Sequence, residues 1–257
     1  MKLLKAEMLK YKVEMSTYYA DYVANLINTA IFFTGFFFLL KKDSTEITVN
    51  KMIIGFIFWF FTNDVISQMG ASISEEKQLG TLDQIILKPV NLEKVLFIRV
   101  LCWNLVSFFI VAILFSVLSI VFKTKLILNF TILLPFIVTL IGLLGIGYIL
   151  ATLTLLYTKT ASLSGIIQYI LLFFTGAVIP LDDIPVILKK ISLLLPLTQG
   201  IKLSQKIIEN QLALKDVILS QNFLSLCLSS TIFILIGLTL FKSQLKKAKL
   251  KGISNHY

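Results

Sequence analysis

The chain has few of the residues on which several protein classes depend. Its 257 residues include 2 Cys, 5 Pro, 12 Gly and 1 His, and charged residues make up only 15%. Two cysteines cannot build a disulfide scaffold, and so little Gly and Pro excludes a collagen-like chain. A single histidine, with no Cys or His cluster, leaves a metal site without ligands. No nucleophile–base pair is visible in the apolar segments, so we expect no catalytic residues and no metal.

Apolar residues are what the chain has in excess. Hydrophobic residues make up 57% of the sequence, and the mean hydropathy is +0.88. A soluble domain carries about 25% charged and about 45–50% apolar residues. At about 20 apolar residues per helical span, this length allows roughly six or seven spans. The composition therefore predicts a polytopic membrane protein.

Uninterrupted apolar stretches mark six spans. They cover residues 22–40, 52–72, 95–121, 128–157, 161–179 and 223–241. We expect an all-α membrane protein in which residues 22–241 form one six-span domain. Residues 1–21 precede this domain, and a basic tail follows it at 242–257.

The distribution of basic residues predicts the orientation. The net charge is +10. An even number of spans puts both termini on one side, and fourteen of the 24 Lys and Arg fall on that side. Because basic loops stay in the cytoplasm, we expect both termini to be cytoplasmic. The lysines are dispersed between apolar runs, so no nucleic-acid partner is expected.

The first 21 residues predict an amphipathic helix that lies in the cytoplasmic membrane interface. Leu4, Met8, Tyr11 and Met15 recur at helical spacing, with lysines on the other faces. Such lysines lie near anionic lipid headgroups. The helix anchors and orients the first span, or it also contacts a cytoplasmic partner.

Residues 74–92, between the second and third spans, predict a short helix on the cytoplasmic side. Gly80 ends the preceding helix, Thr81 and Gln84 fit a capping box, and Pro89 ends the new helix. An apolar face and nearby acids suit docking into a basic-rimmed groove, with simple packing at the interface as the alternative. The apolar face consists of Leu82, Ile85 and Ile86, and the acids are Glu75, Glu76 and Asp83.

Residues 180–221, before the last span, predict a re-entrant pair of short helices on the external side. Pro180, Pro185 and Pro196 forbid one continuous helix. The stretch 184–195 is amphipathic but is too short and too charged to span a bilayer, and Asp182 lies close before it. The alternative is an amphipathic loop that rests on the membrane surface.

Together these two segments resemble the permease subunits of type-2 ATP-binding-cassette (ABC-2 type) exporters, and the resemblance covers essentially the whole chain. In that family a coupling helix follows the second span, and a re-entrant hairpin precedes the last one. The coupling-helix pattern matches Glu76, Gly80, Thr81, Leu82, Asp83, Gln84, Ile85, Ile86, Pro89 and Val90. The hairpin pattern matches Gly176, Pro180, Ile184, Pro185 and residues 195–198. The family often has Arg after the acid, and here Lys77 follows Glu76.

The resemblance implies a function in export across the plasma membrane. Two permeases, as two copies or as paralogues, would sit in the lipid on two ATPase subunits. This chain has no phosphate-binding loop, so ATP and Mg would be bound by the separate ATPase and no cofactor by this chain. Closure of the ATPase dimer would push on the short helix, and the second span would carry the movement into the bilayer.

The cargo implied by the resemblance is a hydrophobic or amphipathic molecule such as a drug, an antimicrobial peptide or a lipid-like molecule. Export of a lipid-linked polysaccharide is the alternative within transport. A membrane immunity or scaffold protein that works without ATP is the alternative from another class.

A few residues inside the spans are candidate cargo contacts. Asp64 and Gln68 share one face of the second span, and a carboxylate at that depth usually faces a cavity or the bundle interior. They form a polar contact in the path or dimer interface, or a structural hydrogen bond between spans. The aromatic residues at 32–38 and 56–61 are expected to face lipid, with a greasy path as the alternative. Gly142, Gly145 and Gly147 predict a close approach of helices in the fourth span.

Overall fold

The computed structural model describes residues 2–41, 46–87, 91–122, 129–157 and 160–251. Every regular element in these ranges is a helix, as expected. The elements are α1 (Lys2–Thr17), α2 (Tyr19–Lys41), α3 (Glu46–Gln78), α4 (Leu82–Leu87), α5 (Leu92–Phe122), η1 (Phe130–Ile132), α6 (Leu133–Leu156), α7 (Ala161–Phe174), η2 (Leu181–Asp183), α8 (Val186–Ser192), α9 (Pro196–Asn210), α10 (Leu214–Ile218) and α11 (Gln221–Lys251).

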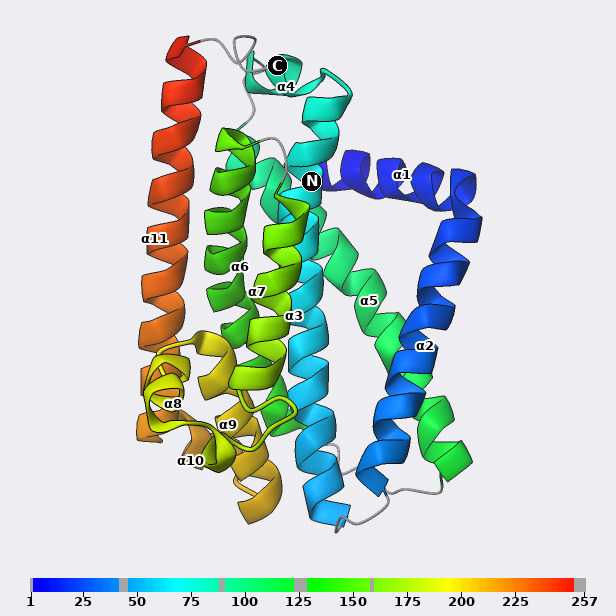
Figure 1. The fold of residues 1–257 in the computed structure, drawn as a ribbon, viewed down its shortest axis with the longest axis vertical. Coiled ribbons are helices and arrows are strands. Elements are labelled where there is room, and N and C mark those ends of the chain that lie inside the picture. Colours follow the sequence, from blue (N-terminus) through cyan, green and yellow to red (C-terminus); the bar gives the residue numbers. More distant parts are fainter. Residues whose placement is uncertain (1, 42–45, 88–90, 123–128, 158–159, 252–257) are drawn as a thin grey trace.

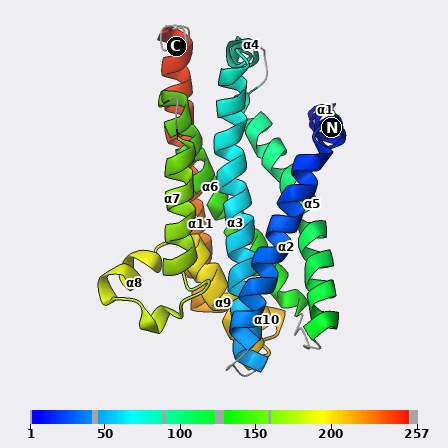
Figure 2. The same cartoon turned by 45° about the vertical axis from the view of Figure 1, so that its right-hand side comes forward.

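The helix α3 runs through the centre of the bundle and packs against α5, α6, α7 and α9 (Figure 1). The helix α2 stands on one side of α3, and the pair α6 and α11 stands on the other. The helix α1 lies crosswise to α2. The start of α1, the helix α4 and the end of α11 lie toward one end of the bundle, whereas α8, α9 and α10 lie toward the other (Figure 2).

Four helices in the described ranges are long and apolar enough to cross a bilayer. They cover Thr48–Gln78, Leu92–Ile113, Phe130–Leu156 and Gln221–Lys249. The helices α2 and α7 occupy the positions of the first and fifth expected spans, but the apolar part of α7, Ser162–Phe174, is shorter than a bilayer crossing. The chain is thus a multi-pass helical membrane protein, and the count of six spans stays a prediction.

Several helix ends differ from the expected span ends. The helix α3 continues to Gln78 and α11 to Lys251, because the polar residues beyond the apolar runs are good helix formers. The first part of the expected basic tail is therefore helical. The helix α7 ends at Phe174, five residues before the expected end of the fifth span. Gly176 follows with a φ of +84°, a backbone angle at which glycine carries no steric penalty.

The helices α6 and α11 approach each other at glycines. A Cβ added to Gly145 would lie 2.3 Å from the carbonyl carbon of Phe233, and one added to Gly237 would lie 2.2 Å from the carbonyl oxygen of Gly145. Both distances are far below van der Waals contact. The predicted close approach at Gly145 is confirmed.

The aromatic residues of α3 were expected to face lipid, and this is wrong for Phe56, Phe58, Trp59 and Phe61, which are buried in the bundle. The rings of Phe58 and Phe61 pack edge-on against Phe136 of α6, with centroids 5.1 and 5.0 Å apart. The central position of α3 explains the difference, because helices surround it on most sides.

Candidate functional site

The short helix between α3 and α5 forms as expected. Gly80 ends the preceding turn with a φ of +67°, and α4 covers Leu82–Leu87. Its first backbone bond runs from the Ile85 N–H to the Thr81 carbonyl at 3.1 Å. The Thr81 hydroxyl donates back to the carboxylate of Glu76. The predicted end at Pro89, with Val90, lies outside the described residues.

The apolar face of α4 points into the chain and not toward a partner. Leu82 is 1% exposed, Ile86 is also buried, and Ile85 packs partly against the same core. The hypothesis that this face docks outward is therefore wrong in its choice of face, because the face is used to hold α4 against the bundle. The residues that α4 and its preceding turn present outward are Leu79, Gln84 and Leu87, the last of which is 85% exposed.

Glu76 is held by bonds within the chain. Its carboxylate accepts a hydrogen bond from the Arg99 guanidinium at 2.7 Å and lies 3.6 Å from the Lys10 ammonium. Arg99 also donates to Glu7 of α1 at 3.1 Å. We call Glu7, Lys10, Glu76 and Arg99 the ion cluster. The ion cluster joins α1, α3 and α5 at the point where α3 leads into α4. Glu76 was expected to pair with a partner, and this is wrong because its carboxylate is already paired within the chain.

The other two acids of this region lie outside the ion cluster. Glu75 is exposed and lines a cavity, and Asp83 is half-buried on α4.

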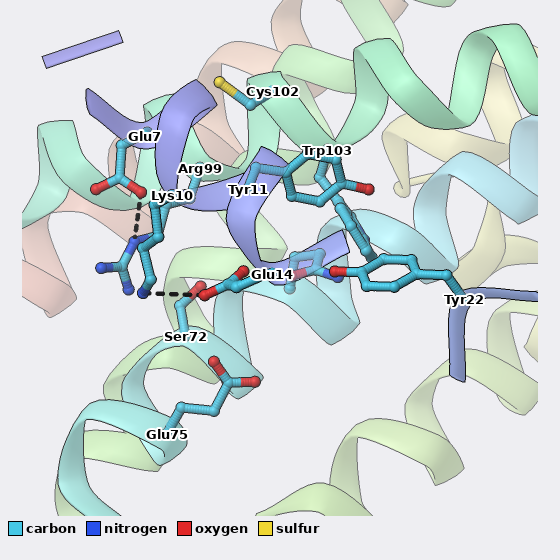
Figure 3. A pocket seen from close by; sticks show the side chains of 11 residues that line it. Glu7, Lys10, Tyr11, Glu14, Tyr22, Ser72, Glu75, Arg99, Cys102 and Trp103 are labelled. Atoms are coloured by element: carbon cyan, nitrogen blue, oxygen red, sulfur yellow. Dashed lines mark hydrogen bonds and ion pairs between the residues drawn. The ribbon is translucent and has the colours of Figure 1, made fainter. Parts of the chain in front are cut away.

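The first cavity, of about 230 Å³, opens between α1, α3 and α5 (Figure 3). The ring of Tyr11 lies edge-on to that of Trp103, with centroids 4.7 Å apart. The ring centroid of Tyr22 lies 5.7 Å from that of Trp103. Burial raises the pKa of the Tyr11 phenol above its ordinary value, and Tyr22 adds to the effect. Tyr11 thus belongs to the packed face of α1, together with the charged Glu7 and Glu14. The predicted apolar face is wrong in part, because Met8 and Met15 are exposed.

The second cavity, of about 620 Å³, lies between α2, α3 and α5 and includes Asp64 and Gln68 in its lining. The Ser107 hydroxyl of α5 donates to the Asp64 carboxylate. The Gln168 amide of α7 donates to the Ser67 hydroxyl at 2.8 Å. The predicted hydrogen bond between helices is therefore present, and Asp64 also lines a cavity. A role in a path or dimer interface stays a prediction.

The three prolines divide residues 180–221 as expected. Pro180 precedes η2, Pro185 precedes α8 and Pro196 begins α9. The helix α9 packs into the bundle with Leu197 and Ile201 fully buried, whereas α8 exposes most of its apolar side chains.

One hydrogen bond and one apolar contact stabilise the part of this segment before and within α8. Asp182 accepts a hydrogen bond from Lys189 at 2.7 Å, and this bond lowers the pKa of that carboxyl. The turn at Gly176 precedes η2, with Leu181 packed 3.1 Å from the position of an added Cβ.

A family model described as ABC-2 type transporter matches residues 1–208. The chain belongs to the ABC-2 type transporter family. No curated protein matches the chain closely enough to add a relative to this assignment. Proteins of the ABC-2 type provide the membrane part of ABC transporters, and hydrolysis of ATP usually belongs to a separate subunit. The matched residues include α4, the ion cluster, both cavities and most of α9.

Some residues of this ABC-2 protein were missed from the sequence. Arg99 was not among the candidate site residues, although it lies inside an apolar run and a charge there needs a partner. That signal pointed to an acid such as Glu76. Nothing in the sequence indicated the roles of Ser107 and Gln168, because an isolated polar residue in a span does not reveal which helix it faces.

Proposed function

We propose that the chain is the permease subunit of an ATP-driven exporter. It works with a separate ABC ATPase and with a second permease copy or paralogue, and it moves an amphipathic molecule out across the plasma membrane. In this proposal α4 is the coupling helix, and both termini lie in the cytoplasm. The prolines and Gly176 shape the re-entrant hairpin, with α8 and α9 as its two helices.

The observation that carries the proposal is the construction of α4. A two-turn helix normally has little stability of its own. Here it is anchored to the bundle through Leu82 and Ile86, and its preceding turn is tied to the ion cluster through Thr81 and Glu76. An anchored helix of this kind transmits a push to α3, whereas a polar loop would absorb it. Leu79, Gln84 and Leu87 are then the side chains that meet the ATPase.

The test is co-purification of the ATPase subunit from the native membranes in mild detergent. We expect the unchanged chain to retain a protein with vanadate-sensitive ATP hydrolysis. Leu87→Glu places a charge at the docking surface and lowers the retained activity roughly tenfold, because a charge left unpaired in an interface core is costly.

Ile187→Glu is the matched control. Ile187 is an apolar side chain on α8 that is 75% exposed, at the other end of the bundle. This variant should retain the ATPase as the unchanged chain does. If Leu87→Glu retained as much ATPase as Ile187→Glu, α4 would not be the docking element. If the unchanged chain retained no ATPase, the proposed function would be wrong.

A further inference from the structure

The two cavities adjoin along α3, and we call them together the path. They share the lining residues Tyr11, Tyr22, Gln68 and Trp103. The smaller cavity lies beside the ion cluster, and the larger one extends along the span to Asp64 and the aromatic rings of α2. A cavity of about 620 Å³ falls in the size range of sites for organic molecules.

The charge of this path is opposite to that of the chain. The chain has a net charge of +10, yet acids outnumber bases along the path. The bases are Lys10 and Arg99, and the acids are Glu7, Glu14, Glu75 and Asp64. Both bases already form ion pairs with carboxylates. The remaining field attracts cations.

Asp64 is the deepest of these acids. Within the described ranges no Lys or Arg forms an ion pair with it, and its hydrogen bond comes from the Ser107 hydroxyl. A carboxylate offers about four acceptor positions. The Ser107 hydroxyl occupies one of them, and Asp64 lines the cavity. A carboxylate within a span calls for a cationic partner, and no Lys or Arg of the described residues supplies one.

Aromatic rings line the approach to Asp64. Trp59, Trp103 and Tyr22 all line the larger cavity. The faces of Trp and Tyr attract organic cations and also pack against apolar groups. Asn63 and Gln68 add hydrogen-bonding groups on the same wall. A carboxylate among such rings suits a molecule with one cationic group and an apolar body.

We propose that this path binds amphipathic organic cations, with the cationic group at Asp64 and the apolar body against the rings of Trp59, Trp103 and Phe32. That these cations are the exported cargo rests on the proposed function. The binding itself does not, because it requires no ATPase.

The chain carries its own reporter for this binding. Its 2 Trp are Trp59 and Trp103, and both line the cavity. The experiment titrates the purified full chain, in dodecyl maltoside without ATPase or ATP, with tetraphenylphosphonium. Tetraphenylborate, an anion of the same shape, is the matched probe. We expect a saturable change of tryptophan fluorescence with the cation and much weaker binding of the anion.

The decisive variant is Asp64→Asn, which keeps the shape and can still accept from Ser107. We expect it to weaken binding of the cation roughly tenfold or more, as loss of a charged partner does. Asp64→Glu keeps the charge and should largely retain binding. Asp216→Asn, an exposed acid on α10, is the control that should change nothing.

Three results would overturn the proposal. One is unchanged cation binding in Asp64→Asn, and another is an equal loss of both probes, which would make Asp64 only a packing residue. The third is an altered oligomeric state with intact probe binding, which would make the groove a contact between two copies. The chain alone is used, so a failed ATPase co-purification leaves this test intact, and absent probe binding leaves the ATPase assignment standing.

Discussion

Arg99 shows at the scale of single residues how the chain places a permanent charge inside an apolar helix. It is half-buried on α5 and pairs with Glu76 at 2.7 Å and with Glu7 at 3.1 Å. Taking such charges out of water costs several kcal/mol per ion unless they are paired and hydrogen-bonded. The guanidinium meets this condition by bridging two carboxylates on two different helices.

Removing one partner should therefore cost more than the loss of a surface ion pair. Glu76→Leu leaves Arg99 with only Glu7 and leaves the Thr81 hydroxyl without its carboxylate acceptor. We expect a loss of about 3 kcal/mol, which lowers the Tm by roughly 9 °C for a chain of this size. Thermal unfolding in detergent measures it.

The matched control is Glu209→Leu. Glu209 pairs with Lys51 at 3.0 Å and is exposed, so its removal should cost less than about 1 kcal/mol. Equal shifts of the Tm in Glu76→Leu and Glu209→Leu would show that the ion cluster has no special role in stability.

At the scale of helices, the close packing of α6 against α11 limits the size of the side chains that the interface can hold. Their backbones approach so closely that Gly145 and Gly237 have no room for a side chain. We expect Gly145→Ala or Gly237→Ala to push the helices apart, at a cost of about 3 kcal/mol from overpacking. The yield of monodisperse protein in size-exclusion chromatography, together with the Tm, measures the effect.

Gly35→Ala on α2 is the control for this prediction, because an added Cβ there meets nothing within 4 Å. It should leave the yield unchanged and raise helix stability by up to about 1 kcal/mol. If Gly145→Ala behaved like Gly35→Ala, the α6–α11 approach would be looser than described.

Helices were the most predictable elements of the chain. Apolar runs located every long helix, and the Gly80 signal located the start of α4. The face of each helix could not be predicted, because in a membrane protein both lipid-facing and buried surfaces are apolar. For that reason Phe56 and Phe58 were assigned to lipid, and docking and simple packing were both left open for Leu82.

The site was predictable only in part for the same reason. Asp64 and Glu76 stood out, since acids in or beside apolar runs are rare. Their partners Ser107 and Arg99 lie 43 and 23 residues away along the chain. Only the packing of α3 against α5 brings them together.

At the scale of the whole molecule, the expected orientation in the membrane predicts which positions an impermeant reagent can label. Gln84 on α4 is exposed at the end of the bundle that holds α1, and Ile187 on α8 is exposed at the other end. In a chain with Cys102 and Cys227 replaced by Ala, an impermeant maleimide should label Ile187→Cys in intact cells. It should label Gln84→Cys only after permeabilisation, because the basic side faces the cytoplasm.

The opposite labelling pattern would reverse the orientation of the bundle. It would also place α4 where no cytoplasmic ATPase can reach it. Labelling of both positions in intact cells would contradict the assignment of the two ends to opposite sides of the membrane.

The unbroken course of α3 from Glu46 to Gln78 has a mechanical consequence. At 1.5 Å per residue, Asp64 lies about 27 Å from the first end and about 21 Å from the second. Asp64 therefore lies near the middle of α3. If the Glu46 end is held and α3 moves as a rigid rod, a sideways displacement of about 4 Å at Gln78 displaces Asp64 by about 2 Å. The displacement of Asp64 is slightly more than one half of that at Gln78. That is well beyond the distance range that a hydrogen bond tolerates. If Asp64 holds a cargo cation as proposed, a movement of α4 changes the contact between Asp64 and that cation.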